Sequence, residues 1–222
     1  MVIFMSDNVL AASKIQAGQR LPPDFFTRAD VVQIARDLLG RVLVTEFDGL
    51  RTAGRITETE AYRAPDDRAC HAWNNRRTAR TEVMFREGGR AYIYLCYGIH
   101  HLFNVVTGPE NAAHAVLIRA IEPLEGVQIM MERRGWPDLT KRRPAALTTG
   151  PGALSRALGL DTRWNGLHFS DPETPVWIEE PERLLPEEDI ISGKRIGVDY
   201  AGECAEWPWR FWVKQSPFVK KV

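Results

Sequence analysis

The stretch Ile56-Thr57-Glu58-Thr59-Glu60-Ala61-Tyr62 organises this chain of 222 residues. If it is a β-strand, successive side chains alternate between faces, so Ile56, Glu58, Glu60 and Tyr62 share one face. Two carboxylates and a phenol on one face can offer a general base and a flat aromatic wall to a planar ligand. Solvent-facing strands also carry glutamate, so an active site and an ordinary solvated strand are both open at this point.

The segments around that strand predict a mixed domain. Residues 28–39 carry apolar side chains at helical spacing after a capping box at 27–30. A strand at 41–47 leads through Asp48-Gly49, a strong hairpin signal, into a return strand at 51–62. Further strands are expected at 91–97, 102–107, 115–121, 176–178, 195–198 and 210–214, and further helices at 125–133 and 151–158. Clustered strands with few helices favour a single α+β domain over alternating βαβ units.

Length and composition are those of a globular protein with its own core. The chain is 44% hydrophobic and 26% charged, and no window approaches the roughly 18 apolar residues that a membrane span needs. Residues 1–20 have a short apolar start but no basic lead and no processing site. We therefore expect a disordered segment at 1–20, no secretory signal, no membrane contact, and a single domain at 21–222.

The cysteine pattern argues against a disulfide framework and against a metal site. Cys70, Cys96 and Cys204 are few, odd in number and widely spaced, which favours a reducing, intracellular compartment. The adjacent pairs Cys70-His71 and His100-His101 have poor spacing for one tetrahedral ion. We expect no metal and no cofactor.

Charge is balanced overall but segregated along the sequence. The 29 Lys and Arg residues equal the 29 Asp and Glu residues, so the net charge gives no support to nucleic-acid binding. Basic residues nevertheless cluster at 76–80 and 133–143, and acidic residues cluster at 179–189. A charge run is most often a solvated face, so this segregation is compatible with a polyanionic partner but does not indicate one.

Tyrosines concentrate in one predicted strand. Tyr92 and Tyr94 would share a face, and Tyr97 stands directly before Gly98, a natural turn position. Aromatic residues commonly fill the core from strands, and Tyr92 fits that role. An aromatic residue at a hairpin tip is harder to bury, and proteins that open DNA through the minor groove use such wedges.

The order and spacing of these segments resemble one family, the alkyladenine (3-methyladenine) DNA glycosylases. The resemblance runs from about residue 22 to residue 219. It is carried by 58–62, His71, Met84-Phe85, 92–98, Asn104, 117–126, Gly150-Pro151, 196–198, 201–203, Arg210-Phe211 and Ser216-Pro217.

The resemblance implies a curved, mainly antiparallel sheet with peripheral helices and a projecting β-hairpin. It also implies an enzyme of base excision repair that flips alkylated or deaminated purine nucleotides out of double-stranded DNA, contacting the minor groove. The N-glycosidic bond would be hydrolysed by an activated water, leaving an abasic site. No lysine is clearly placed as a nucleophile, so a monofunctional glycosylase acting as a monomer is expected.

The same resemblance assigns the groups nearest the reacting bond. Glu60 matches the general base, and Glu58 is a secondary electrostatic or structural group on the same face. Arg119 matches a residue near the phosphate of the flipped nucleotide and near the nucleophilic water. The backbone carbonyl of Val198 also holds that water.

It assigns the pocket in the same way. Tyr62 matches one wall, and His71 and Tyr94 match the other. Asn104 matches a residue that crowds the exocyclic amine of guanine. Tyr97 matches the wedge that replaces the flipped nucleotide.

Each assignment has an ordinary alternative. Arg119 follows an apolar run and could pair with Glu122, since a buried arginine needs partners. His71 could be a surface or capping histidine, Asn104 a hydrogen-bonding strand residue, and Glu60 a strand carboxylate. Two rival functions remain: a catalytically silent sensor of damaged DNA, and a carbohydrate hydrolase that uses Glu58 and Glu60.

Two departures from the family pattern bear on DNA contact. Ile99-His100-His101 follows the wedge where an aromatic or apolar residue is expected, and the loops at 73–75 and 108–111 do not align. Phosphate contacts are expected from the basic segments at 76–80 and 133–143 and from His100. The candidates are Arg76, Arg77, Arg80, His100, Arg142 and Arg143.

Overall fold

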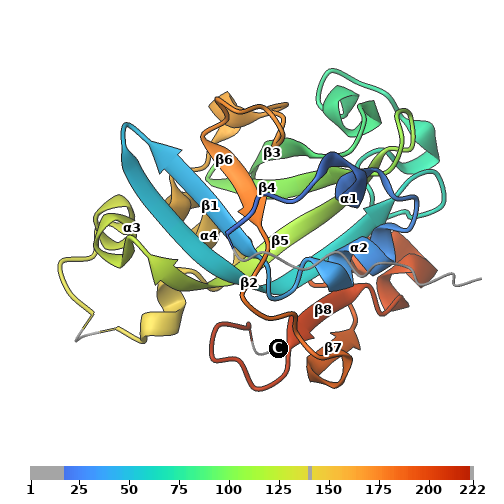
Figure 1. Ribbon diagram of the computed structural model, residues 1–222. Helices are drawn as coiled ribbons and strands as arrows, with labels where there is room; N and C mark the ends of the chain where they lie inside the picture. The colour runs from blue at the N-terminus through green and yellow to red at the C-terminus, as the bar shows by residue number, and fades with distance from the viewer. Residues whose placement is uncertain (1–17, 140–141, 221–222) are drawn as a thin grey trace, which may run out of the picture.

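The computed structural model describes residues 18–139 and 142–220, which build one antiparallel sheet with a few short helices (Figure 1). Every strand pair in it is antiparallel. The strands are β1 (Val42–Phe47), β2 (Leu50–Arg63), β3 (Arg90–Cys96), β4 (His100–Thr107), β5 (His114–Glu125), β6 (Val176–Glu179), β7 (Ile190–Gly193) and β8 (Arg210–Val213). The helices are α1 (Pro23–Thr27), α2 (Val31–Asp37), α3 (Val127–Arg134) and α4 (Pro151–Leu158). The predicted α+β class is confirmed.

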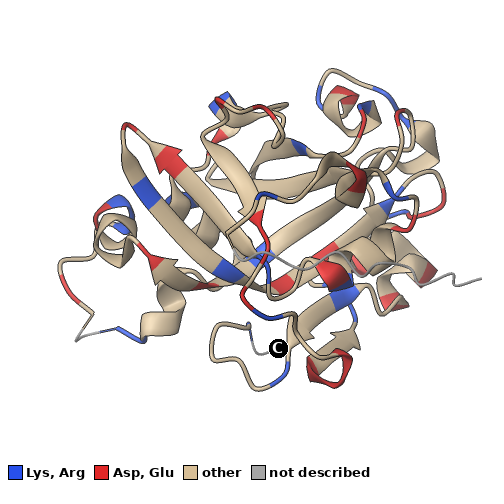
Figure 2. Ribbon diagram, viewed as in Figure 1, with Lys and Arg blue, Asp and Glu red and all other residues tan. Residues whose placement is uncertain are grey.

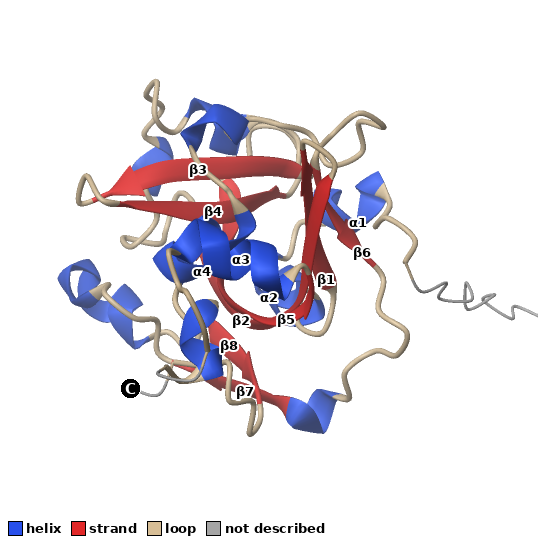
Figure 3. Cartoon of the chain, turned by 90° about the vertical axis from the view of Figure 1, so that its left-hand side faces the viewer, coloured by secondary structure: helices blue, strands red, loops and turns tan. Residues whose placement is uncertain are grey.

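The long strands β2 and β5 form the backbone of the sheet. The strand order is β3-β4-β5-β2-β1-β6, and β8 pairs with both β2 and β7. β1 pairs with the first half of β2, whereas β8 pairs with Glu58, Thr59 and Glu60 in its second half. Figure 3 shows β3 and β4 running across the direction of β1 and β6, so the sheet is strongly curved. The helices pack on it around one main core that includes Phe26, Leu38, Phe103 and Leu154.

Local sequence signals place two features as predicted. The Asp48-Gly49 turn joins β1 to β2 with φ values of 53° and 74°, the pair of positive angles that a type I′ hairpin turn requires. Helix α4 occupies Pro151–Leu158, with proline at its first position and Gly159 in the left-handed conformation after its end.

The predicted helix at 28–39 is shorter than expected: it is α2 alone, and the separate helix α1 ends just before the predicted range. Arg28 closes α1 in an extended conformation, with ψ of 144°, and the chain restarts as α2 at Val31. The N-cap of α2 is Asp30, whose carboxylate accepts hydrogen bonds from the amides of Val32 and Gln33. The predicted capping box with Thr27 as N-cap is therefore wrong. Asp30, which the prediction placed inside the helix, is itself the N-cap.

The predicted strand at 195–198 is also wrong. The strand in this region is β7, and the following turn includes Gly197 with φ of +77°. Arg195 leaves the ladder because its buried guanidinium pairs with Asp67.

Most of the segment expected to be disordered, residues 1–17, lies outside the described residues. The last part of it belongs to the folded domain. The Gly18 amide donates to the carbonyl of Glu180, and Arg20 forms a β-bridge with Glu179.

Candidate active site

A pocket of about 420 Å³ opens between the β3–β4 hairpin, β5 and the segment 196–200. Many of the predicted site residues line it although they are distant in the sequence. They are Tyr62, His71, Arg80, Tyr94, Tyr97, Asn104, Arg119 and Val198. The volume is within the range of small-molecule sites, which suits one nucleobase better than a polymer segment.

Glu60 lies directly behind this pocket rather than on its surface. Its side chain is fully buried. One carboxylate oxygen accepts hydrogen bonds from the Tyr62 hydroxyl at 2.7 Å and from Nη1 of Arg119 at 3.1 Å. The other accepts from the Ile196 amide at 2.7 Å. Each of the three partners can donate to a carboxylate, so the site is built to hold one. Burial and the Glu60 charge raise the pKa of Tyr62 well above its ordinary value.

Arg119 bridges the two glutamates. Its Nε lies 2.8 Å from Oε1 of Glu58, which also accepts from Nε of Arg210 at 2.7 Å. Two carboxylates and two guanidiniums thus balance within one buried network. The alternative pairing of Arg119 with Glu122 is wrong, because Glu122 pairs with Arg55. A carbohydrate hydrolase needs open space between its two carboxylates, and here Arg119 joins them.

An irregularity in the strand pairing creates this arrangement. Ile56 pairs with Ile121 and Thr59 with Ile118, and the register shifts on both sides of Glu58. Ile56 consequently packs in the main core with Ala61, so the prediction that it shares a face with the glutamates is wrong.

Three aromatic rings form one wall of the pocket. The rings of His71 and Tyr94 lie 4.6 Å apart at 77°, and those of Tyr92 and Tyr94 lie 5.5 Å apart. Nδ1 of His71 is 2.8 Å from the Tyr92 hydroxyl. Burial and the nearby charge of Arg80 lower the pKa of His71 to about 4, so its ring is neutral at physiological pH. Tyr92 is buried as expected, and it lines the pocket as well.

Tyr97 stands at the exposed tip of the β3–β4 hairpin, as predicted. Tyr97 and Gly98 have φ values of 51° and 71°, and the Ile99 amide bonds to the Cys96 carbonyl, which closes a tight turn. Tyr97 is 92% exposed and Ile99 72% exposed. Large apolar side chains exposed at the tip of a tight turn are typical of an interaction surface.

Asn104 and Val198 line the pocket but already use part of their hydrogen-bonding capacity. The Asn104 amide nitrogen donates to the carbonyls of Tyr92 and Leu102 at 3.0 and 3.3 Å. The Val198 carbonyl accepts from the Ala201 amide at 2.8 Å, which leaves one lone pair for a water.

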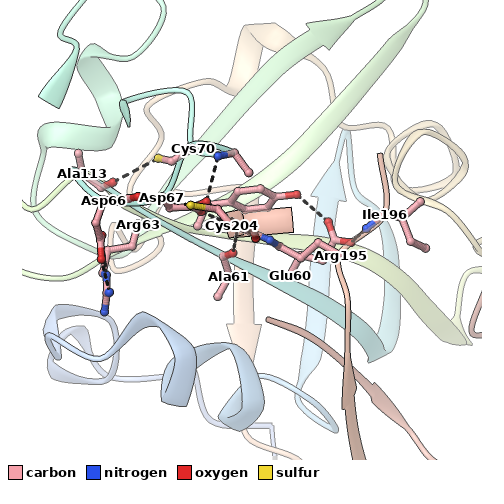
Figure 4. Close-up of polar contacts among 12 residues, drawn as sticks. Glu60, Ala61, Arg63, Asp66, Asp67, Cys70, Ala113, Arg195, Ile196 and Cys204 are labelled. Carbon is pink, nitrogen blue, oxygen red and sulfur yellow. Dashed lines mark hydrogen bonds and ion pairs between the residues drawn. The ribbon is translucent and has the colours of Figure 1, made fainter. Parts of the chain in front are cut away.

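Sequence reasoning missed the buried ion pair that supports the site. Asp67 and Arg195 have fully buried side chains and are joined by two hydrogen bonds, one of them 2.8 Å long (Figure 4). Arg195 also donates to the carbonyl of Ala61, and the next residue, Ile196, donates to Glu60. The pair thus anchors the segment that holds Glu60. Asp67 lies in the region that resembles the family and could have been noted as a candidate charged group. Its partner could not be identified, because Arg195 lies 128 positions away.

The predicted phosphate contacts are separated in space. Arg76, Arg77, His100, Arg142 and Arg143 are exposed and do not line the pocket. Arg77 is bridged to Glu82, and Arg142 lies over the Trp136 ring. Arg80 alone of these candidates lies on the pocket wall.

The described residues, 18–139 and 142–220, contain no group of three or more His, Cys, Asp or Glu side chains placed to hold a metal ion. No helix within those ranges is long and apolar enough to cross a membrane.

Comparison with known families decides the relationship. The model of the methylpurine-DNA glycosylase family matches residues 24–217. The chain belongs to this family. A relative in Chlamydia pneumoniae is 48% identical over 191 residues, covering 86% of this chain and 93% of the relative. One in Bacillus cereus is 45% identical over 202 residues, covering 90% and 98%. Each is named "Putative 3-methyladenine DNA glycosylase".

Within this family member, the matched region contains the whole pocket and the hairpin tip. The match also extends over Asp67 and Arg195, so the supporting ion pair lies in the part of the chain that family membership covers.

Proposed function

We propose that this protein is a monofunctional DNA glycosylase that flips a damaged purine nucleotide from duplex DNA and hydrolyses its N-glycosidic bond. The observation that carries the proposal is the Glu60 carboxylate, held by three donors directly behind a pocket with aromatic walls. The size of the pocket, the neutral His71 ring and the tyrosine faces suit a flat base.

Hydrolysis requires a group that stabilises positive charge on the sugar and accepts a proton from water. Glu60 accepts hydrogen bonds from Tyr62, Arg119 and Ile196, three residues that line the pocket. A water that enters between these residues can transfer its proton to the carboxylate while the glycosidic bond breaks. Arg119 positions the carboxylate and attracts the nucleotide phosphate. The free lone pair of the Val198 carbonyl orients the water.

Extruding a nucleotide costs a few kcal/mol, least when it is damaged. Tyr97 offsets part of that cost by entering the stack from the minor groove. Its side chain is exposed at the tip of the turn and also lines the edge of the pocket.

Replacing Tyr97 with serine is expected to weaken binding of lesion duplex without affecting folding. The side chain is 92% exposed, so its loss removes no core packing and Tm should change by less than about 2 °C. Capture of the flipped nucleotide should fall about tenfold, as measured with a fluorescent base in the lesion position. Severe unfolding of the variant would show instead that Tyr97 supports the fold.

A second groove, next to the hairpin tip, offers arginines to DNA phosphates, and Glu46, Asp48 and Asp161 line it as well. It has a volume of about 780 Å³ and adjoins Ile99 and His100. Among the described residues, Arg133, Arg134 and Arg156 in this groove pair with no carboxylate, and the ribbon of α3 carries the blue of Lys and Arg positions in Figure 2. Burial lowers the pKa of Arg133, and no carboxylate offsets the effect. Arg156, which sequence reasoning passed over, belongs to this set.

The substitution Arg156→Gln should weaken binding to damaged and undamaged duplex alike. Removing one phosphate contact reduces the slope of log K against log salt by about one unit. Titrations of a labelled duplex at several salt concentrations measure this slope. The matched control is Arg183→Gln, an exposed arginine in a separate cleft, which should leave the slope unchanged. Equal slopes for Arg156→Gln and the unmodified chain would show that Arg156 in this groove makes no phosphate contact, which would contradict the prediction.

The function itself is tested by free-base release. Duplexes that carry 3-methyladenine, 7-methylguanine, hypoxanthine or ethenoadenine are incubated with excess protein, and released base is measured by chromatography. Release of at least one base with an abasic strand as the second product supports the proposal. Tight binding of lesion duplex without release would favour a sensor of damaged DNA.

A further inference from the structure

One positive charge lies against the aromatic wall. The guanidinium carbon of Arg80 is 4.8 Å from the centre of the Tyr94 ring, and Nη2 of Arg80 is 3.2 Å from Nε2 of His71. Its charge also opposes the effect of burial, which raises the pKa of Tyr92 to about 12. A single side chain thus acts on all three rings of the wall. The prediction that Arg80 contacts the DNA backbone takes no account of this position.

The charge of Arg80 is not balanced locally. Within the described chain, Arg80 pairs with no carboxylate, although Arg77, three residues earlier, is bridged to Glu82. The charge of Arg80 therefore acts on the pocket without a neutralising carboxylate. Solvent at its exposed end weakens that effect.

Arg80 also determines which nitrogen of His71 carries the proton. A guanidinium has donors and no acceptor, so Nε2 of His71 must accept from it. The remaining ring proton lies on Nδ1 and is donated to the Tyr92 hydroxyl, 2.8 Å away. The wall therefore presents a neutral imidazole, two phenols and one cation to whatever enters the pocket.

This charge distribution distinguishes between two classes of damaged purine. A purine methylated at a ring nitrogen carries a positive charge while it is in DNA, and it gains from contact with tyrosine faces. The same cationic base is repelled by a fixed guanidinium on that wall, and the guanidinium already uses the electron-rich face of Tyr94. A neutral purine such as hypoxanthine is not repelled.

We propose that Arg80 is a specificity-determining residue that shifts the pocket's preference from cationic alkylated purines toward neutral purines. This inference rests on the proposed glycosylase function and adds the charge class of the substrate to it. Arg80 acts through its charge and through the two rings that it touches.

The test compares single-turnover release of 7-methylguanine and of hypoxanthine from otherwise identical duplexes. Arg80→Gln removes the charge and keeps an amide donor for Nε2 of His71. It should raise the ratio of 7-methylguanine to hypoxanthine release by roughly three- to tenfold. Arg80→Lys keeps the charge and should leave the ratio within about twofold of the unmodified chain.

Arg77→Gln is the matched control because it removes an arginine of the same exposed segment that does not line the pocket. It should leave the ratio unchanged, since a lost phosphate contact weakens both duplexes equally. The pKa of His71, followed by NMR, gives a readout that needs no activity. It should rise in Arg80→Gln and stay near 4 in Arg80→Lys.

An unchanged ratio in Arg80→Gln, or an equal loss of both activities, would overturn the inference and leave the glycosylase function standing. An unmodified chain that releases none of the four damaged bases would overturn the proposed function and this inference with it.

Discussion

Replacing Glu60 with glutamine is expected to slow single-turnover release of a damaged base by about 10³-fold, a typical loss for a general base. The amide cannot accept a proton from water or stabilise positive charge on the sugar. Glutamine also replaces one of the two acceptor oxygens with an NH₂ donor, which then faces at least one of the donors from Tyr62, Arg119 and Ile196. Lesion duplex should still bind, because the pocket and the hairpin tip are unchanged.

Glu58→Gln is the control for this experiment. Glu58 is equally buried, pairs with the same Arg119, and accepts from three donors: Arg119, Arg210 and the Lys220 amide. Both variants remove one negative charge from the same network, so both should lower stability. Glu58 does not contact Tyr62 or Ile196, and its replacement should cost less than about tenfold in rate. Equal rate losses in the two variants would assign the effect of Glu60 to the network rather than to the chemistry.

Replacing Asp67 with asparagine is expected to lower the free energy of unfolding by about 3–5 kcal/mol. The substitution is nearly isosteric, but it leaves the Arg195 guanidinium buried without a counter-charge. Urea denaturation followed by tryptophan fluorescence measures the change. The segment after Arg195 should loosen, so excision should fall as the Ile196 amide releases Glu60.

The neighbouring substitution Asp66→Asn provides the comparison. Asp66 also pairs with an arginine, Arg63, but both side chains are more than a third exposed. A solvent-exposed ion pair of this kind contributes about 0–1 kcal/mol. Similar destabilisation by the two substitutions would mean that burial of the Asp67 pair has no special importance.

The sequence predicts the features that depend on residues close together in the chain. The Asp48-Gly49 turn follows from two residues that adopt positive φ readily, the Tyr97-Gly98 turn is indicated by its glycine, and α4 follows from its proline start and glycine end. Alternation along β2 also placed Glu60 and Tyr62 together correctly. It failed at Ile56 because a shift in pairing register is a property of two strands.

The candidate pocket was found because its residues follow a pattern in sequence order that resembles a family. The partners of its charged groups were not found in this way. The ordinary alternative for Arg119 was a pairing with Glu122, three residues away, but Arg119 bonds to glutamates 59 and 61 positions earlier. The contact of Arg80 with the Tyr94 ring was not predicted either.

By itself the sequence determined the class of the fold, the two tight turns, and the set of side chains available for chemistry, because backbone sterics and side-chain alternation act between neighbours in the chain. Only the tertiary structure decided which arginine neutralises which carboxylate and which arginine stays unbalanced. Coulomb energy depends on distance in space and on burial, and both are set when β2, β5, β8 and the segment around Arg195 come together.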